Sequence, residues 1–221
     1  MNRLTRRYVK VSGALNTSTA SRIARRIDEL MDLLLDEAIQ RWSAESFFRF
    51  DDQEPSCAVR ILDHCLRAKR DDQTYEWLDV VAEWHQFDHA MMSGRASVAS
   101  AKRPDLRFRI GDRYRLLEAK RLTRHSPLPG DYVDKGIARF TSGRYIVEDG
   151  RAAMLGFLID DQANVVVPVV NTEIESRPAM SSANHLKHHR TVRSGYDLYL
   201  SSHSTVAGGN VQLTHHLVEV S

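Results

Sequence analysis

Alternating apolar and polar residues fill residues 104–120, and Gly111-Asp112 interrupts the alternation. Glycine at the first central position of a two-residue loop is typical of a type II′ β-hairpin, so two short antiparallel strands are predicted here. The loop length fixes the register and places Asp105 directly opposite Glu118. The other face of the hairpin is apolar and is expected to enter a core; it carries Leu106, Phe108, Ile110, Leu117 and Ala119.

The predicted hairpin gathers ionisable side chains on one face. Opposed residues of an antiparallel pair have Cβ atoms about 5 Å apart, so the carboxylates of Asp105 and Glu118 would be neighbours. Lys120 shares their face because side chains alternate with a period of two. Adjacent carboxylates repel each other, and a hard cation such as Mg²⁺ removes this repulsion. The alternative is a surface hairpin with an ordinary set of two acids and one base.

Pro104-Asp105 on one strand and Glu118-Ala119-Lys120 on the next resemble the motif of the PD-(D/E)xK nuclease superfamily. The resemblance implies a restriction-endonuclease-like α-β-β-β-α-β core and hydrolysis of phosphodiester bonds that leaves a 5′-phosphate. It also implies a Mg²⁺ ion, for which Mn²⁺ would substitute. Asp105, Glu118 and the carbonyl of Ala119 would bind the ion, and Lys120 would position the attacking water. The motif covers only residues 104–120.

The resemblance implies a further acidic residue on the helix that precedes the hairpin. Helical spacing of apolar residues predicts such a helix over residues 75–92. Glu76 is the first choice for this acid and Glu83 the second, although acids in a first helical turn are also favoured by the helix dipole. His85 and His89 lie four residues apart on the same helix, as either a metal pair or a surface pair.

Helices are also predicted by apolar spacing at about residues 19–42, 55–68 and 131–145. Residues 152–159 are continuously apolar and predict a buried central strand. Residues 165–170 are predicted to form an edge strand or a strand end, and residues 171–195 a short helix and a loop. Residues 196–201 and 211–220 are predicted to form a second hairpin, in which His203 would lie roughly opposite His215.

The predicted fold is therefore α/β, with N-terminal helices and a C-terminal β-hairpin, and the resemblance implies that its core is restriction-endonuclease-like. Residues 1–72 would form a mainly helical extension and residues 73–221 the nuclease-like core, packed as one unit. A chain of 221 residues is long enough for one such domain with additions. The apolar content of 42% and charged content of 27% are ordinary for a globular protein.

Positively charged residues are concentrated around the hairpin, although the net charge of the whole chain is only +2. Residues 102–124 hold nine Lys or Arg residues against three acids, which would attract a polyanion. The candidate nucleic-acid contacts are Arg107, Arg121, Lys135 and Arg139. Ordinary solvent-exposed charges on a strand and a helix are the alternative.

Other features narrow the class of protein. The two cysteines, Cys57 and Cys65, fit neither a disulfide framework nor a metal site. No apolar run approaches the ~18 residues of a membrane span. The N-terminus is rich in Arg, Ser and Thr, as in a transit peptide, but a short strand at 8–11 followed by a turn is the favoured interpretation. A cytoplasmic protein without a membrane partner is expected.

These residues, together with the resemblance, predict a Mg²⁺-dependent nuclease that acts on DNA in the cytoplasm. A role in defence against foreign DNA rests on analogy alone. Besides DNA, the expected partners are a second copy of the chain and a partner protein of a defence system; both rest on analogy. One alternative is a non-cleaving nucleic-acid-binding or assembly subunit that retains the nuclease fold. Another is a metal-dependent hydrolase of small phosphoesters, which the basic residues disfavour.

Overall fold

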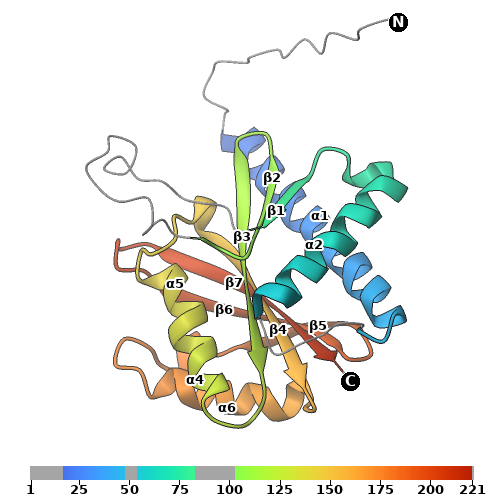
Figure 1. Cartoon of the computed structure of the whole chain (residues 1–221). Helices are drawn as coiled ribbons and strands as arrows, with labels where there is room; N and C mark the ends of the chain where they lie inside the picture. The colour runs from blue at the N-terminus through green and yellow to red at the C-terminus, as the bar shows by residue number, and fades with distance from the viewer. Residues whose placement is uncertain (1–16, 48–53, 83–102, 221) are drawn as a thin grey trace, which may run out of the picture.

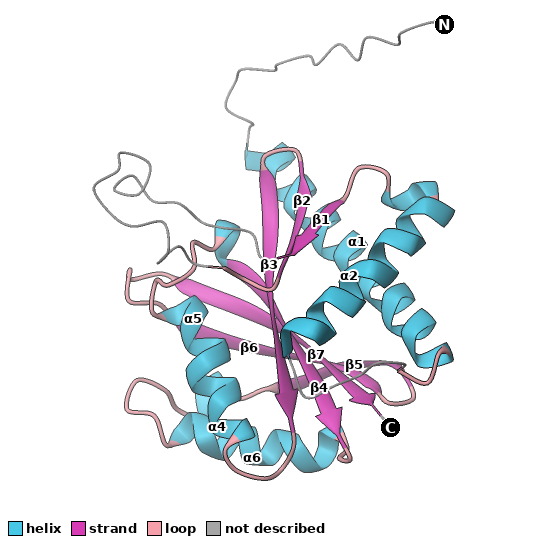
Figure 2. Ribbon diagram, in the orientation of Figure 1, coloured by secondary structure: helices cyan, strands magenta, loops and turns pink. Residues whose placement is uncertain are grey.

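A computed structural model describes residues 17–47, 54–82 and 103–220 as a seven-stranded sheet with helices on both faces (Figures 1 and 2). The predicted α/β class is therefore correct. The strands run in the order β1-β2-β3-β4-β7-β6-β5. They are β1 (Asp79–Ala82), β2 (Leu106–Ile110), β3 (Arg113–Leu122), β4 (Arg151–Ile159), β5 (Lys187–Arg193), β6 (Tyr196–Ser204) and β7 (Asn210–Val220).

The sheet is mixed. Strands β1, β2 and β3 form an antiparallel meander, β4 is parallel to both β3 and β7, and β7, β6 and β5 are antiparallel again. A parallel pair needs a long crossover, and three consecutive helical segments supply it between β3 and β4. These are α4 (Leu128–Tyr132), the π-helical turn η3 (Val133–Ile137) and α5 (Ala138–Thr141).

Helices cover the two faces of the sheet separately, as Figure 1 shows. Helices α1 (Thr17–Ala44) and α2 (Glu54–Asp71) pack on one face, where Trp42, Phe108 and Phe157 belong to one buried core. The α4–η3–α5 segment and α6 (Ala163–Glu175) cover the other face. The helices predicted at 19–42 and 55–68 and the strand at 152–159 are confirmed. Within the described ranges, no helix has the length and apolar composition to cross a membrane.

The predicted helix over residues 75–92 is wrong where the structure describes it. A short 3₁₀ turn, η1 (Gln73–Tyr75), leads into strand β1, in which Val80 pairs with Phe108 and Ala82 with Leu106. Pairing with the neighbouring strand overrides the helical spacing, because a short apolar run suits either structure. Residues 83–92, with Glu83, His85 and His89, lie outside the described residues.

Two further predictions in the last third of the chain are wrong. Residues 165–170 lie inside α6, although their β-branched residues and Pro168 favour an edge strand. The buried residues Ala163, Val166, Val167, Val170 and Ile174 have helical spacing, so burial against the sheet decides. Residues 187–193 form edge strand β5, which carries almost no apolar alternation because it is largely exposed.

The C-terminal hairpin is confirmed, but its histidines do not face each other. The register pairs His203 with Val211 and His215 with Tyr199. The two rings meet instead through Ser201, whose Oγ lies 2.7 Å from Nε2 of each histidine. Burial lowers the pKa of His203 to about 4 and holds the pKa of His215 well below its usual value, so both rings are neutral. The Tyr132 hydroxyl lies 2.8 Å from His215 Nδ1, which ties α4 to the sheet.

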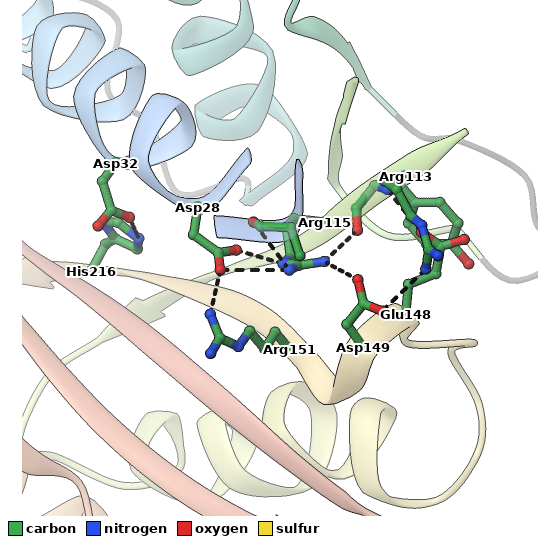
Figure 3. Close-up of polar contacts among 10 residues, drawn as sticks. Asp28, Asp32, Arg113, Arg115, Glu148, Asp149, Arg151 and His216 are labelled. Atoms are coloured by element: carbon green, nitrogen blue, oxygen red, sulfur yellow. Dashed lines mark hydrogen bonds and ion pairs between the residues drawn. The ribbon is translucent and has the colours of Figure 1, made fainter. Parts of the chain in front are cut away.

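Ion pairs fasten α1 to the sheet (Figure 3). Arg115 of β3 is 1% exposed, and its Nε donates to Asp28 Oδ1 at 2.5 Å. Arg151 of β4 donates to the other oxygen of Asp28 at 2.7 Å. One turn along α1, Asp32 Oδ1 lies 3.5 Å from Nε2 of the buried His216. The carboxylate of Asp28 thereby connects strands β3 and β4, and Asp32 lies beside the neutral His216 of β7.

Asp32 makes the stability of the fold depend on pH. Burial raises the pKa of Asp32 to about 6, and Asp28 adds to this while Arg190 opposes it. Between about pH 4 and pH 6 Asp32 in the folded protein therefore holds a proton that the unfolded chain has lost, so the contribution of Asp32 to stability falls as the pH rises through this range. Relative to Asp32→Asn, we expect the wild-type unfolding free energy to fall by about 2 kcal/mol from pH 4 to pH 8 in urea titrations. A difference that is constant across these pH values would contradict this assignment.

Candidate active site

Strand β3 separates the polar and apolar halves of the predicted motif onto its two faces. Leu117 and Ala119 are fully buried in the core beneath α1 and α2. Glu118 and Lys120 point the other way, toward the α4–η3–α5 segment, since successive side chains alternate. The register of β2 and β3 pairs Leu106 with Leu117, as the sequence predicts.

Asp105 reaches the same place from the residue before β2. Its Oδ2 accepts a hydrogen bond of 2.7 Å from the backbone N–H of Ala119, between Glu118 and Lys120. Asp105 and Glu118 are close enough for Glu118 to raise the pKa of Asp105. The hairpin thus gathers the two acids and the lysine of the motif.

Glu118 is completely buried and receives hydrogen bonds from three side chains. Lys120 Nζ donates to Oε1 at 2.9 Å, and Arg139 Nη1 from α5 donates to the same oxygen. The Tyr145 hydroxyl donates to Oε2 at 2.8 Å and accepts from Arg139 Nη1 at 3.0 Å. A buried carboxylate needs such donors to stay ionised.

Lys120 is held between the sheet and the helical crossover. It is 4% exposed, and Nζ also donates to the carbonyl oxygen of Ala119 at 2.9 Å. The crossover approaches closely because residue 136 is glycine: a Cβ there would lie 2.5 Å from Met154 Cε and 3.6 Å from Lys120 Cγ. Gly136 lies in the π-helical turn η3, and π turns are frequent at functional sites.

The electrostatics of the site are balanced between two acids and two bases. Burial first, and the neighbouring Glu118 second, raise the pKa of Asp105 to about 7, against the opposing effects of the Ala119 amide, Lys120 and Arg139. With both carboxyl groups ionised, Lys120 and Arg139 just cancel their charge. Because Asp105 is only partly ionised at neutral pH, the site then carries at most a small positive charge.

The donor set fits a hard divalent ion. The carboxylates of Asp105 and Glu118 and the carbonyl of Ala119 are oxygen donors, which Mg²⁺ and Mn²⁺ take. The repulsion that raises the pKa of Asp105 is what a cation between the acids would relieve. Within the described residues, no three His, Cys, Asp or Glu side chains group together as metal ligands. These two acids would therefore leave most positions around an ion to water or substrate.

The structure does not bring Glu76 to this site. Glu76 is exposed and follows η1, and the β1–β2 register pairs Asp79 with Arg109, away from Asp105. Its prediction as the upstream acid depends on a helix that is a strand in the structure. Glu83, the second choice, lies outside the described residues.

The four predicted nucleic-acid contacts fall in different places. Arg107 pairs with Leu116 and shares the Glu118 face of the sheet, whereas Arg121 alternates onto the face of Ala119. Lys135 is 64% exposed and pairs with Asp131. Arg139 contacts Glu118 directly, so it is part of the site and not only of its surroundings.

Tyr145 is a site residue that sequence reasoning misses. It is 3% exposed and lies in the loop after α5, and its ring packs edge-on against Phe140 with centroids 5.4 Å apart. A tyrosine 27 residues from Glu118 along the chain carries no local signal of this contact. Only the packing of the crossover onto the sheet brings it there.

No protein-family model, curated protein or solved structure matches the chain. Function must therefore be inferred from the site itself.

Proposed function

We propose that the protein is a Mg²⁺-dependent nuclease with a restriction-endonuclease-like core, hydrolysing phosphodiester bonds in DNA. The observation that carries the proposal is the meeting of Asp105, Glu118 and Lys120 on one face of a hairpin, beneath a helical crossover. The order of elements supports it: helices, three antiparallel strands, a helical crossover and a strand parallel to the third. This is the order that the PD-(D/E)xK resemblance implies.

Each residue of the site has a role in this proposal. Asp105, Glu118 and the carbonyl of Ala119 hold the ion, which when bound supplies Lewis-acid chemistry at the phosphate. Lys120 donates a hydrogen bond to the attacking water and stabilises the negative charge that develops on phosphorus-bound oxygens. Because Lys120 is buried, its ammonium group acts at low dielectric, where its effect on the developing charge is strongest.

The charge balance explains why such a site would need the ion. Without it, the two acids largely cancel the charges of Lys120 and Arg139, so the attraction for a phosphodiester is weak. A divalent ion would give the site a net positive charge that matches an anionic substrate. Arg107, on the same face of the sheet, would add a contact to the phosphate backbone.

DNA as substrate, a role in defence, a homodimer and a partner protein of a defence system remain predictions. A non-cleaving DNA-binding subunit is the second candidate, and one observation favours it: three side chains of the protein itself donate hydrogen bonds to Glu118. One test distinguishes the two candidate functions: whether the protein cuts DNA in a metal-dependent way.

Glu118→Gln provides that test. The purified wild type, incubated with plasmid and Mg²⁺ or Mn²⁺, should cut the DNA, and EDTA should stop the reaction. Glu118→Gln keeps the volume of the side chain but removes a metal-ligating charge, so we expect cleavage to fall at least about 100-fold. Glu45→Gln, an exposed acid on the loop after α1, is the control and should cut like the wild type. Wild-type protein that binds plasmid without cutting it would favour the non-cleaving subunit.

A further inference from the structure

Arg139 forms an ion pair with Glu118, which is one of the two carboxylates of the proposed metal site. Its Nη1 donates to Glu118 Oε1, the oxygen that also receives Lys120 Nζ at 2.9 Å. With the Tyr145 hydroxyl on Oε2 at 2.8 Å, both oxygens of Glu118 are engaged by protein donors. Two cationic donors already meet at Oε1, and both would repel a divalent ion bound to the same oxygen. The arginine and a divalent ion are therefore competitors for Glu118.

The surroundings of Arg139 allow it to move. Its side chain is 25% exposed, whereas Glu118 is completely buried and Lys120 nearly so. Arg139 lies on α5, a four-residue helix that follows the π-helical turn η3. A guanidinium at the edge of a buried site, on a long side chain, can turn toward solvent while its backbone stays in place.

We propose that Arg139 exchanges partners during the reaction. It pairs with Glu118 in the metal-free protein, and it turns to the substrate phosphate when a divalent ion occupies the two carboxylates. A planar guanidinium binds phosphate as well as carboxylate, through the same pair of N–H donors. Arg139 is then a substrate-binding residue that also competes with the ion for Glu118, while Lys120 moves from Oε1 to the attacking water and Tyr145 keeps its place on Oε2. This inference rests on the proposed function.

The exchange predicts that one substitution, Arg139→Gln, strengthens the binding of Mn²⁺ and weakens the effect of Mn²⁺ on DNA binding. Arg139→Gln removes the competing charge, so Mn²⁺ should bind at least about tenfold more tightly, the range of one hydrogen bond to a charged group. The same variant lacks the phosphate contact, so Mn²⁺ should no longer strengthen the binding of a fluorescent duplex oligonucleotide as it does for the wild type. A purely structural arginine would weaken both when removed. Arg139→Ala serves if the Gln variant does not fold.

Two further variants separate the parts of the inference. Tyr145→Phe removes a donor to Glu118 but keeps Arg139, so Mn²⁺ binding should tighten while its effect on oligonucleotide binding stays. Arg177→Ala is the matched control: its side chain is 24% exposed and pairs with Asp134 and Glu173 instead of Glu118. It should leave Mn²⁺ affinity unchanged.

Titration calorimetry with Mn²⁺ alone, and fluorescence anisotropy of the oligonucleotide with and without Mn²⁺, give the answer. Tighter Mn²⁺ binding by Arg139→Gln, together with loss of the Mn²⁺ effect on oligonucleotide binding, supports the exchange. Unchanged or weaker Mn²⁺ binding by Arg139→Gln, with normal binding by the wild type, overturns the exchange and leaves the proposed nuclease intact. Absence of Mn²⁺ binding in both proteins overturns both.

Discussion

Lys120→Met should strongly slow cleavage while leaving the protein folded. Methionine keeps most of the length of the side chain, which lies against Gly136, and removes only the ammonium group. Glu118 would still receive hydrogen bonds from Arg139 and Tyr145, so its burial remains tolerated. Because a buried ammonium acting on the developing charge is worth a factor of about 10² to 10³, we expect the rate of plasmid cleavage to fall by that factor.

The control for this variant is Lys187→Met, an exposed lysine on edge strand β5. It removes the same charge from the chain and should leave the cleavage rate unchanged. Thermal unfolding of both variants shows whether the loss is chemical. A Lys120→Met protein that cuts DNA at more than about a tenth of the wild-type rate would contradict the role of Lys120 in the reaction.

Arg115→Met should destabilise the fold more than a change at the exposed ion pairs of α1. Arg115 is 1% exposed and binds Asp28 of α1, and its Nη1 lies 3.7 Å from Asp149 (Figure 3). Asp28 is 26% exposed and keeps Arg151, so the loss is that of the charge-assisted hydrogen bonds of the buried arginine, about 2 kcal/mol. Urea unfolding at pH 7 measures the difference in unfolding free energy.

Arg151→Met removes the solvent-exposed partner of the same carboxylate, Asp28. Arg151 also pairs with Asp28, at 2.7 Å, but its side chain is 48% exposed. Solvent screens such a pair, so the expected loss is below about 1 kcal/mol. Equal losses from the two variants would show that burial does not set the contribution of Arg115 to stability.

The hairpin can be predicted from the sequence because its determinants are local. Gly111 has φ +58°, as its position in a tight turn requires, and the two-residue loop then fixes every pair from Ile110–Arg113 to Leu106–Leu117. The neighbourhood of Asp105, Glu118 and Lys120 follows from that register. No distant part of the chain is needed to bring them together.

The rest of the site depends on contacts that local patterns do not report. Arg139 and Tyr145 reach Glu118 only because η3 packs onto Met154 at Gly136. Strand β1 and helix α6 have short apolar runs that suit either structure, and pairing with β2 or packing on the sheet decides between them. The sequence pattern puts the upstream acid on a helix that β1 replaces, which is why the prediction of Glu76 is wrong.

The central claim is that Asp105 and Glu118 together hold a divalent ion. Titration of the protein with Mn²⁺, followed by the electron paramagnetic resonance signal of free Mn²⁺, tests it without DNA. The wild type should bind Mn²⁺, Asp105→Asn and Glu118→Gln should each lose that binding, and Asp63→Asn, a partly exposed acid of α2, should keep it. Mn²⁺ binding that survives both Asp105→Asn and Glu118→Gln, or none in the wild type, would contradict the claim.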